Sequence, residues 1–308
     1  MSGRPIGRRG LLLMLAFDHR SSFAREVTGT DEAVGPDAAR VRAAKEVVFE
    51  GLARAAAEVD AAALGLLVDE QYGAAVVSRA RALGITVAVP VERSGQAVFE
   101  FEYGEDFMDH VRGVGPDMAK VLVRLNVEDD PGANEIQLER LRRLADELRP
   151  AGYGFLFELL VPPTERQLES CGHERDRYER ELRPRLIVAG MRAVQAAGIE
   201  PDVWKVEGVE RVDEAAEIIA AARAEARWAD VACTVLGAGA AAERVGRWLD
   251  TAAAAGFSGF AIGRSIWRDP LRAHLEGDLT ETEVSAVVHE RFLQFAVRFQ
   301  EKAAAAGS

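Results

Sequence analysis

The run LLLMLAFD at residues 11–18 is the stretch of sequence on which we base the fold. Seven consecutive apolar residues are too few for a membrane span and suit one buried β-strand. The polar residues Asp18, His19 and Arg20 end the run. A buried strand that closes on polar side chains makes its carboxyl end a candidate position for functional residues.

Basic residues before this run give it a second interpretation. Arg4, Arg8 and Arg9 precede the apolar stretch, so the segment imitates a secretory signal, even a twin-arginine one. The apolar core is at the short limit for a signal, and no small-residue cleavage site comes after it. We therefore predict a first strand and a cytoplasmic protein with no membrane segment.

Composition narrows the class of protein. The chain has 308 residues, of which 48% are hydrophobic, enough for one large core, and no linker-like stretch separates two halves. We expect a single domain over residues 1–308 with flexible tails at 1–9 and 303–308. The formal charge of -12 argues against a nucleic-acid partner on electrostatic grounds. Cys171 and Cys233 are too few for a disulfide framework or a four-ligand zinc site.

Outward from residue 18, short apolar runs alternate with amphipathic stretches, which is the pattern of repeated βα units around a parallel sheet. The eight expected strands are Leu11–Asp18, Ala62–Asp69, Thr86–Glu92, Ala119–Asn126, Gly154–Val161, Val203–Glu207, Ala232–Gly237 and Gly259–Gly263. The clearest expected helices are Val41–Val59, Glu135–Leu148, Pro184–Ala197, Val212–Arg227 and Ala241–Ala255, with an additional C-terminal helix at Thr280–Ala303.

Eight such units in about 300 residues favour a (β/α)₈ TIM barrel over a doubly wound sheet. No glycine-rich dinucleotide fingerprint comes after the first strand. Barrel active sites are built at the carboxyl ends of the strands. Several expected strands end on a polar residue or a glycine there: Asp18, Asp69, Glu92, Asn126, Gly237 and Gly263.

Side chains alternate in direction along a strand, so residue parity predicts which charges point into the barrel. In VWKVE, residues 203–207, the bulky Trp204 suits the helix-covered outside, which leaves Lys205 inside. The same alternation turns Lys120 inward, and Glu158 interrupts an apolar strand. Together with Asp18, two lysines and two carboxylates are expected to converge.

Two interpretations of these charges remain open. They are buried ion pairs that only satisfy one another, or they are catalytic. In the catalytic interpretation Lys205 is a nucleophile, and burial beside the second ammonium of Lys120 favours its neutral amine. Glu158 would then move protons, and Asp18 would orient a lysine or a substrate hydroxyl.

The loops after the last two expected strands are glycine-containing. They read Leu236-Gly237-Ala238-Gly239 and Ile262-Gly263-Arg264-Ser265. TIM barrels often bind phosphate between these two loops, through backbone N–H groups, a helix N-terminus and a cation such as Arg264. Ordinary βα turns would also contain glycine here.

The motifs resemble those of the class I tagatose-bisphosphate aldolases. The chain more closely resembles the aldolase-like domain associated with bacterial inositol catabolism, over about residues 11–300. The resemblance is carried by LAFDHR (residues 15–20), AKVL (119–122), LFEL (156–159), WKVE (204–207) and Gly263-Arg264. It implies a metal-independent aldolase without cofactor, in which Lys205 forms a Schiff base and Lys120, Glu158 and Asp18 complete the catalytic set. It also implies a homo-oligomer.

By this resemblance the substrate is a phosphorylated keto-sugar that yields dihydroxyacetone phosphate and an aldehyde. The tagatose enzymes usually have Gln where this chain has His19, and Gly208 also departs from their pattern. These departures favour 2-deoxy-5-keto-gluconate 6-phosphate, whose carboxylate Arg20 or Arg124 would receive. Tagatose bisphosphate and sulfofructose phosphate are the alternatives.

Other classes of function fit the sequence less well. A metal-dependent barrel needs converging histidines, and only His19 of the five lies at an expected strand end. A catalytically silent partner of a sugar kinase would have lost the inward lysines. The long segment from Pro162 to Arg183 is either a lid or a charged surface loop. The acidic, aromatic run Glu100–Asp109 suggests no mechanism.

Overall fold

The computed structural model describes residues 10–225 and 229–306, and its strands form one closed parallel barrel in the order β1 to β8. This confirms the predicted (β/α)₈ fold. The barrel strands are β1 (Leu12–Ala16), β2 (Leu64–Leu67), β3 (Thr86–Pro90), β4 (Met118–Arg124), β5 (Gly154–Leu160), β6 (Val203–Glu207), β7 (Ala232–Leu236) and β8 (Gly259–Ile262).

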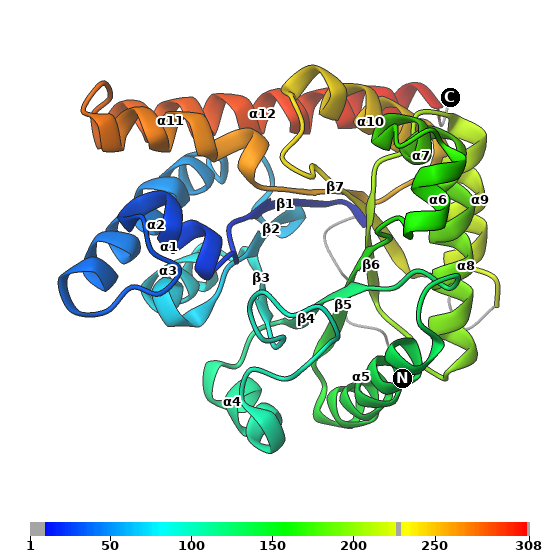
Figure 1. Ribbon diagram of the computed structural model, residues 1–308. Helices are drawn as coiled ribbons and strands as arrows, with labels where there is room; N and C mark the ends of the chain where they lie inside the picture. The colour runs from blue at the N-terminus through cyan, green and yellow to red at the C-terminus, as the bar shows by residue number, and fades with distance from the viewer. Residues whose placement is uncertain (1–9, 226–228, 307–308) are drawn as a thin grey trace.

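Helices surround the barrel in the chain order expected for βα units (Figure 1). They are α1 (Ser21–Thr28), α2 (Gly35–Ala55), α3 (Glu70–Ala82), α4 (Phe107–Val114), α5 (Pro131–Ala151), α6 (Glu165–Ser170), α7 (Arg175–Glu181), α8 (Arg183–Ala196), α9 (Val212–Ala222), α10 (Ala242–Ala255), α11 (Arg264–Glu276) and α12 (Glu281–Ala306). Short 3₁₀ turns are Ala61–Ala63 and Gly104–Asp106.

Several helix boundaries differ from those expected. Helix α2 begins at Gly35 because Pro36 suits the first turn of a helix, where no N–H is needed. Asp130 caps α5 by accepting hydrogen bonds from two backbone N–H groups, which moves its start to Pro131. Helix α9 ends at Ala222, and the last two residues of the expected range Val212–Arg227 lie outside the described chain.

The expected tails have two outcomes. Residues 1–9 lie outside the described chain, as do 307–308. Residues 303–306, however, continue helix α12 to Ala306, so this part of the expected C-terminal tail is helical. The alanines of this segment are strong helix formers, which explains the extension.

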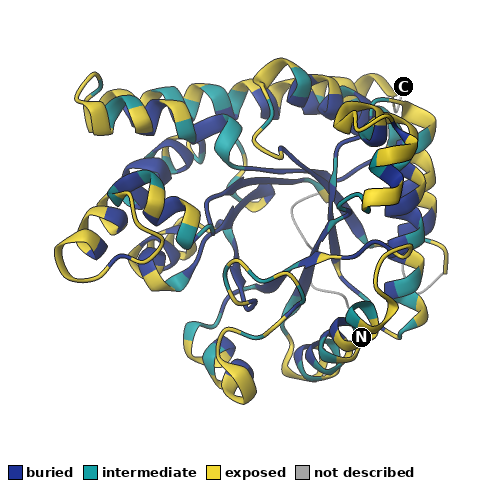
Figure 2. Cartoon of the chain, in the orientation of Figure 1, coloured by how far each residue is buried: buried dark blue, intermediate teal, exposed yellow. Residues whose placement is uncertain are grey.

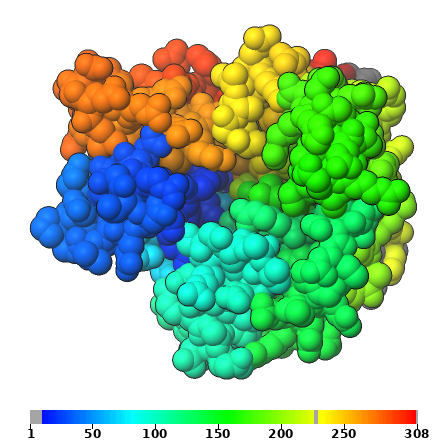
Figure 3. Space-filling view, viewed as in Figure 1, coloured from blue at the N-terminus to red at the C-terminus, as the bar shows by residue number. Residues whose placement is uncertain are grey.

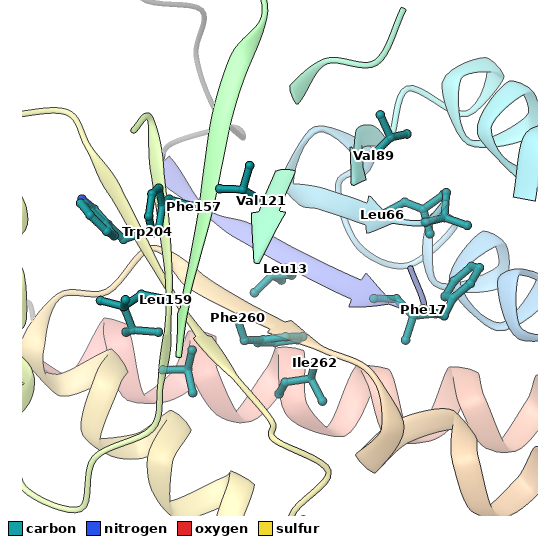
Figure 4. Close-up of a cluster of buried hydrophobic side chains, with 14 of the residues drawn as sticks. Leu13, Phe17, Leu66, Val89, Val121, Phe157, Leu159, Trp204, Phe260 and Ile262 are labelled. Carbon is teal, nitrogen blue, oxygen red and sulfur yellow. The ribbon is translucent and has the colours of Figure 1, made fainter. Parts of the chain in front are cut away.

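Two apolar layers hold the barrel. The larger lies between the strands and the helices and contains large side chains such as Phe157, Trp204 and Phe260, several of them drawn in Figure 4. The smaller fills the barrel interior and includes Leu12, Met14, Met118, Leu156 and Val203. Figure 2 shows the buried strands inside a ring of helices whose outer faces are exposed.

Glycines allow the first and last strands to approach. Strand β8 pairs with β1, and a Cβ on Gly259 would lie 2.0 Å from the carbonyl oxygen of Leu12. A Cβ on Gly263 would lie 2.1 Å from the carbonyl oxygen of Ala16. Any side chain at either position would force the strands apart.

No helix in the described part of the chain is long and apolar enough to cross a membrane.

Candidate active site

Lys205 projects into the barrel from β6, as the alternation along VWKVE indicates. Its neighbour Trp204 packs outside the barrel against Phe157, with ring centroids 5.0 Å apart. Lys205 is only 4% exposed. An ammonium in this position has lost nearly all contact with bulk water and needs a partner within the protein.

Glu158 is that partner, and it joins the two inward lysines. Glu158 and Lys205 stand opposite each other in the register of β5 and β6. Glu158 Oε1 lies 2.8 Å from Lys205 Nζ, and Glu158 Oε2 lies 3.0 Å from Lys120 Nζ. A single carboxylate therefore bridges two ammonium groups.

Lys120 is the centre of the cluster. Besides Glu158, its Nζ donates to Asp18 Oδ2 at 2.7 Å and to Glu92 Oε1 at 2.6 Å. One ammonium thus lies among three carboxylates. Glu158 belongs to β5, and Asp18 and Glu92 lie just beyond the ends of β1 and β3. The structure brings together all four expected catalytic residues and adds Glu92, which the sequence placed only at the end of a strand.

The charges of the cluster shift one another strongly. Burial alone would lower the pKa of Lys120, but Asp18, Glu158 and Glu92 raise that pKa well above its ordinary value. Burial opposes ionisation of Asp18, yet Lys120 holds the Asp18 pKa well below its usual range. Against the same burial, Lys120 and Lys205 lower the pKa of Glu158. At neutral pH Lys120 is a cation, and Asp18 and Glu158 are carboxylates.

A second buried lysine fixes the backbone on either side of Asp18. Lys45, on α2, donates to the carbonyl oxygens of Phe17 at 2.7 Å and His19 at 3.3 Å. It also pairs with Asp69, and both side chains are fully buried. Because the two carbonyls flank Asp18, this pair holds the end of β1 from outside the barrel.

His19 lies at the same strand end. Its side chain is 31% exposed, Nδ1 is 3.9 Å from Asp18 Oδ1, and its ring meets Trp267 edge to face. Burial lowers the pKa of His19 to about 4. The positive charges of Arg264 and Lys205 also lower this pKa, whereas the negative charge of Asp18 raises it. At neutral pH His19 is therefore an uncharged imidazole that can donate and accept a hydrogen bond.

The loops after β7 and β8 meet at the barrel mouth. Arg264 Nη2 lies 3.4 Å from the carbonyl oxygen of Ala238, and Ser265 Oγ donates to the carbonyl oxygen of Ala240 at 2.8 Å. No ion pair of Arg264 is found in the described chain, although the protein is strongly acidic. Helices α10 and α11 both begin without a side-chain cap. Their first-turn N–H groups are donors that an anion could use.

Packing explains part of the glycine content of these loops. Gly239 has φ of +73°, and a Cβ there would lie 3.3 Å from the Arg264 guanidinium carbon. Gly237 faces Ile262 at 3.0 Å, and Gly263 is required by its approach to β1. Close packing against β1 is therefore enough to explain why residue 263 is a glycine. Gly239 instead leaves room for the side chain of Arg264 beside it.

The two arginines expected to receive a substrate carboxylate are held by the segment between β3 and α4. Arg20 is buried, its Nη1 lies 3.1 Å from Glu102, and it donates to the carbonyl oxygen of Glu92. Arg124 is exposed and donates to the carbonyl oxygen of Gln96 at 2.8 Å. The structure thus pairs Arg20 internally and leaves Arg124 the more accessible cation.

The β3–α4 segment consequently crosses the barrel mouth. Its Glu102 pairs with Arg20, which lies in the turn between β1 and α1. Its Ser94 Oγ is 2.9 Å from the Oγ of Ser21, the first residue of α1. In the space-filling view this face is hollowed between the blue, cyan, green and orange parts of the chain (Figure 3). Glu102 gives the acidic run Glu100–Asp109 a function in this contact that no sequence pattern indicated.

The segment from Pro162 to Arg183 contains the short helices α6 and α7, and side chains fasten it to the barrel. Tyr178 donates to the carbonyl oxygen of Val161 at 2.9 Å, and Arg183 Nη1 is 3.2 Å from Glu207. Thr164 and Gln167 form a capping box that begins α6. This T-x-x-Q pattern was a sequence signal for a helix that our interpretation as a lid or a loop missed.

Among the described residues, no group of three or more His, Cys, Asp or Glu side chains is arranged to hold a metal ion. The three carboxylates that converge in the barrel surround the Lys120 ammonium instead.

The fold and the site define a class: a TIM barrel with buried lysines and carboxylates at the carboxyl ends of its strands. Residues 6–303 match the family model described as "Uncharacterized protein conserved in bacteria (DUF2090)", and the chain belongs to that family. Among solved structures it is similar to fructose-bisphosphate aldolase from Plasmodium falciparum, determined with TRAP and a small-molecule inhibitor. The TM-score is 0.66 at 13% identity, covering 96% of this chain and 92% of that one. No curated protein matches the sequence.

Proposed function

We propose that this protein is a Schiff-base aldolase that cleaves a phosphorylated keto-sugar. The observation that carries the proposal is the pairing of Lys205 with Glu158 at 2.8 Å, inside a barrel and beside Lys120, whose pKa the surrounding acids raise. A lysine nucleophile needs a nearby group that accepts its proton, and Glu158 is within hydrogen-bond reach. Similarity to an aldolase of the same fold agrees with the proposal and does not carry it.

The reaction would begin at Lys205. Its neutral amine adds to the substrate ketone, and loss of water gives an iminium ion. A base then removes the proton from the hydroxyl on the carbon that becomes the aldehyde. The carbon–carbon bond breaks, and its electron pair moves toward the iminium to give an enamine. Glu158 is placed to carry protons in these steps, and Lys120 stabilises negative charge that develops on oxygen.

The loops after β7 and β8 are the proposed phosphate site. Arg264 supplies a cation without a carboxylate partner in the described chain, and the uncapped starts of α10 and α11 supply N–H donors. We expect Arg264→Met to raise the KM for the phosphorylated substrate by about 10-fold to 100-fold, the loss of one charge-assisted hydrogen bond. An unchanged KM would remove Arg264 from the site.

For the particular substrate we propose 2-deoxy-5-keto-gluconate 6-phosphate, which would give dihydroxyacetone phosphate and malonate semialdehyde. His19 supports this choice over tagatose bisphosphate, as does the accessible Arg124 at the mouth, which could receive a carboxylate. Gly208 no longer bears on the choice, because a Cβ there would lie 2.3 Å from the Trp248 ring. Assays with this acid, tagatose and fructose bisphosphates and sulfofructose phosphate would rank the candidates by kcat/KM.

Covalent trapping gives a sharp test, because the chain contains only four lysines: Lys45, Lys120, Lys205 and Lys302. The protein is reduced with borohydride in the presence of dihydroxyacetone phosphate, and its peptides are analysed by mass. We expect the adduct on the Lys205 peptide. It should be absent from Lys205→Ala and unchanged in Lys302→Ala, which alters an exposed lysine. Failure to trap any adduct, or an adduct only at Lys302, would contradict the proposal.

A further inference from the structure

Glu92 is a buried acid that the proposed reaction does not use. It lies just beyond β3, and the alternation from Ala88, which lies in the interior cluster, turns it into the barrel. It is 7% exposed, and its Oε1 accepts from Lys120 at 2.6 Å. Its other oxygen, Oε2, is buried and has no hydrogen-bond partner in the described chain. A carboxylate with an unpartnered buried oxygen is an unstable arrangement, whereas a protonated acid there has a hydrogen to donate.

The three acids around Lys120 are not equivalent. Glu158 has the second ammonium of Lys205 at 2.8 Å. Asp18 is also stabilised by the charge of Lys205 in addition to that of Lys120. Among the described residues, Lys120 is the one cation at ion-pair distance from the Glu92 carboxylate. Arg20 donates to the Glu92 backbone carbonyl and pairs with the carboxylate of Glu102.

Charge balance inside the barrel favours the same acid. Two basic side chains, Lys120 and Lys205, face three acids, so ionisation of all three acids would leave at least one buried negative charge unmatched. Burial raises the pKa of Glu92, and the negative charge of Asp18 raises it further. The positive charges of Lys120 and Arg20 oppose this shift. Burial and the charge of Asp18 therefore both favour the protonated form of Glu92.

We propose that Glu92 is a neutral carboxylic acid whose Oε2–H donates a hydrogen bond to a hydroxyl or carbonyl oxygen of the bound sugar. This deepens the proposed function and rests on it for the identity of the ligand. A neutral donor suits this position, because a third carboxylate beside Asp18 and Glu158 would repel the negative charge that develops on the substrate hydroxyl oxygen as it loses its proton. The assignment adds a substrate-binding residue from β3 to the set from β1, β4, β5 and β6.

The protonation state is tested first, in the free protein, and this measurement does not depend on the proposed reaction. The infrared difference spectrum between wild type and Glu92→Gln at neutral pH should contain the carbonyl stretch of a protonated carboxylic acid. Glu100→Gln, which alters an exposed acid of the same segment, should show only carboxylate bands. A carboxylate signal for Glu92 would overturn the proposal.

The contact with substrate is tested with dihydroxyacetone phosphate. Its addition should move the Glu92 acid band to lower frequency. Glu92→Ala should lower kcat/KM by about 10-fold to 100-fold, the effect of losing one buried hydrogen bond. Glu92→Gln should restore most of that loss, because its amide keeps both an acceptor for Lys120 and a donor in place of Oε2–H.

The outcomes separate the two proposals. If no adduct forms at Lys205 in the wild type, the aldolase proposal fails, and the infrared result still decides whether Glu92 is an acid. If adducts form but Glu92→Ala keeps the wild-type rate, or Glu92→Gln is as impaired as Glu92→Ala, the donor role of Glu92 is wrong.

Discussion

Two lysines are buried on opposite sides of the same barrel wall, and they are surrounded very differently. Lys45, outside the strands, has one acid, Asp69, and two backbone carbonyls as partners. The second oxygen of Asp69 accepts from the N–H of Tyr72, so the pair is complete. Lys120, inside the barrel, has three acids, and one oxygen of Glu92 has no partner in the described chain.

Under the proposed function, this difference separates a structural ion pair at Lys45 from a reactive cluster at Lys120. Around Lys45, one ammonium faces one acid, and both oxygens of that acid accept hydrogen bonds. Around Lys120, the acids outnumber their nearest cation, so protons can be redistributed at small energetic cost. The sequence left open whether the inward charges are structural or catalytic, and this excess of acids favours chemistry.

Removing the inner lysine should have the largest effect, and the effect should be on rate. We expect Lys120→Met to lower kcat/KM for the cleaved sugar by about 10³-fold, the scale of losing a positioned charge in proton transfer. Circular dichroism should show that the barrel still forms, because the remaining acids can take up protons. A variant with more than a tenth of the wild-type rate would remove the distinction between the two lysines.

The same substitution at the outer lysine should affect stability instead. Lys45→Met leaves Asp69 and two carbonyl oxygens buried without their donor, and should lower the free energy of unfolding by about 3 kcal/mol. Urea unfolding measures this loss. The matched control is Lys45→Met with Asp69→Asn, which removes the orphaned charge and keeps an oxygen to cap α3. This double variant should be more stable than Lys45→Met alone, and equal instability would contradict the interpretation.

The smallest expected effect is a pH dependence of stability that comes from Glu92. Its pKa is raised in the folded state by burial. Above the ordinary glutamate pKa, the unfolded chain releases this proton while the folded chain retains it. Wild-type stability therefore declines as pH rises from the ordinary value to the raised folded value, and Glu92→Gln lacks this decline. As pH rises through that window, the thermal midpoint of Glu92→Gln should increase relative to that of the wild type. A constant difference between the two midpoints would argue against a raised pKa of Glu92.

Strand parity explains why much of the cluster could be predicted from sequence. Two-residue alternation along the extended backbone placed Lys205 and Lys120 inside the barrel. Glu158 and Asp18 were singled out because each is a charged residue within or at the end of an apolar run. Once the strands close in the order β1 to β8, side chains at their carboxyl ends must converge. The eight strands were found for the same local reason.

Contacts between loops and between layers could not be predicted in this way. The pairing of Arg20 with Glu102 depends on where the β3–α4 segment crosses the mouth, which no periodicity specifies. Lys45 lies on a helix and Asp69 beyond a strand, and only their packing brings them together. The position of Glu92 inside the barrel could have been predicted from sequence. Residue parity along its strand and its place at the strand's end both indicate it.

The pairing of β1 with β8 means that the barrel is sealed by segments from opposite ends of the chain. Trp267 donates to the carbonyl oxygen of Ala16 across 251 positions of sequence, beside the strand that carries Asp18. Arg264 comes directly after the strand that completes this seam. A growing polypeptide therefore contains both lysines of the cluster well before it contains the residues of the proposed phosphate site. The barrel can close around these lysines only after the last strand has been made.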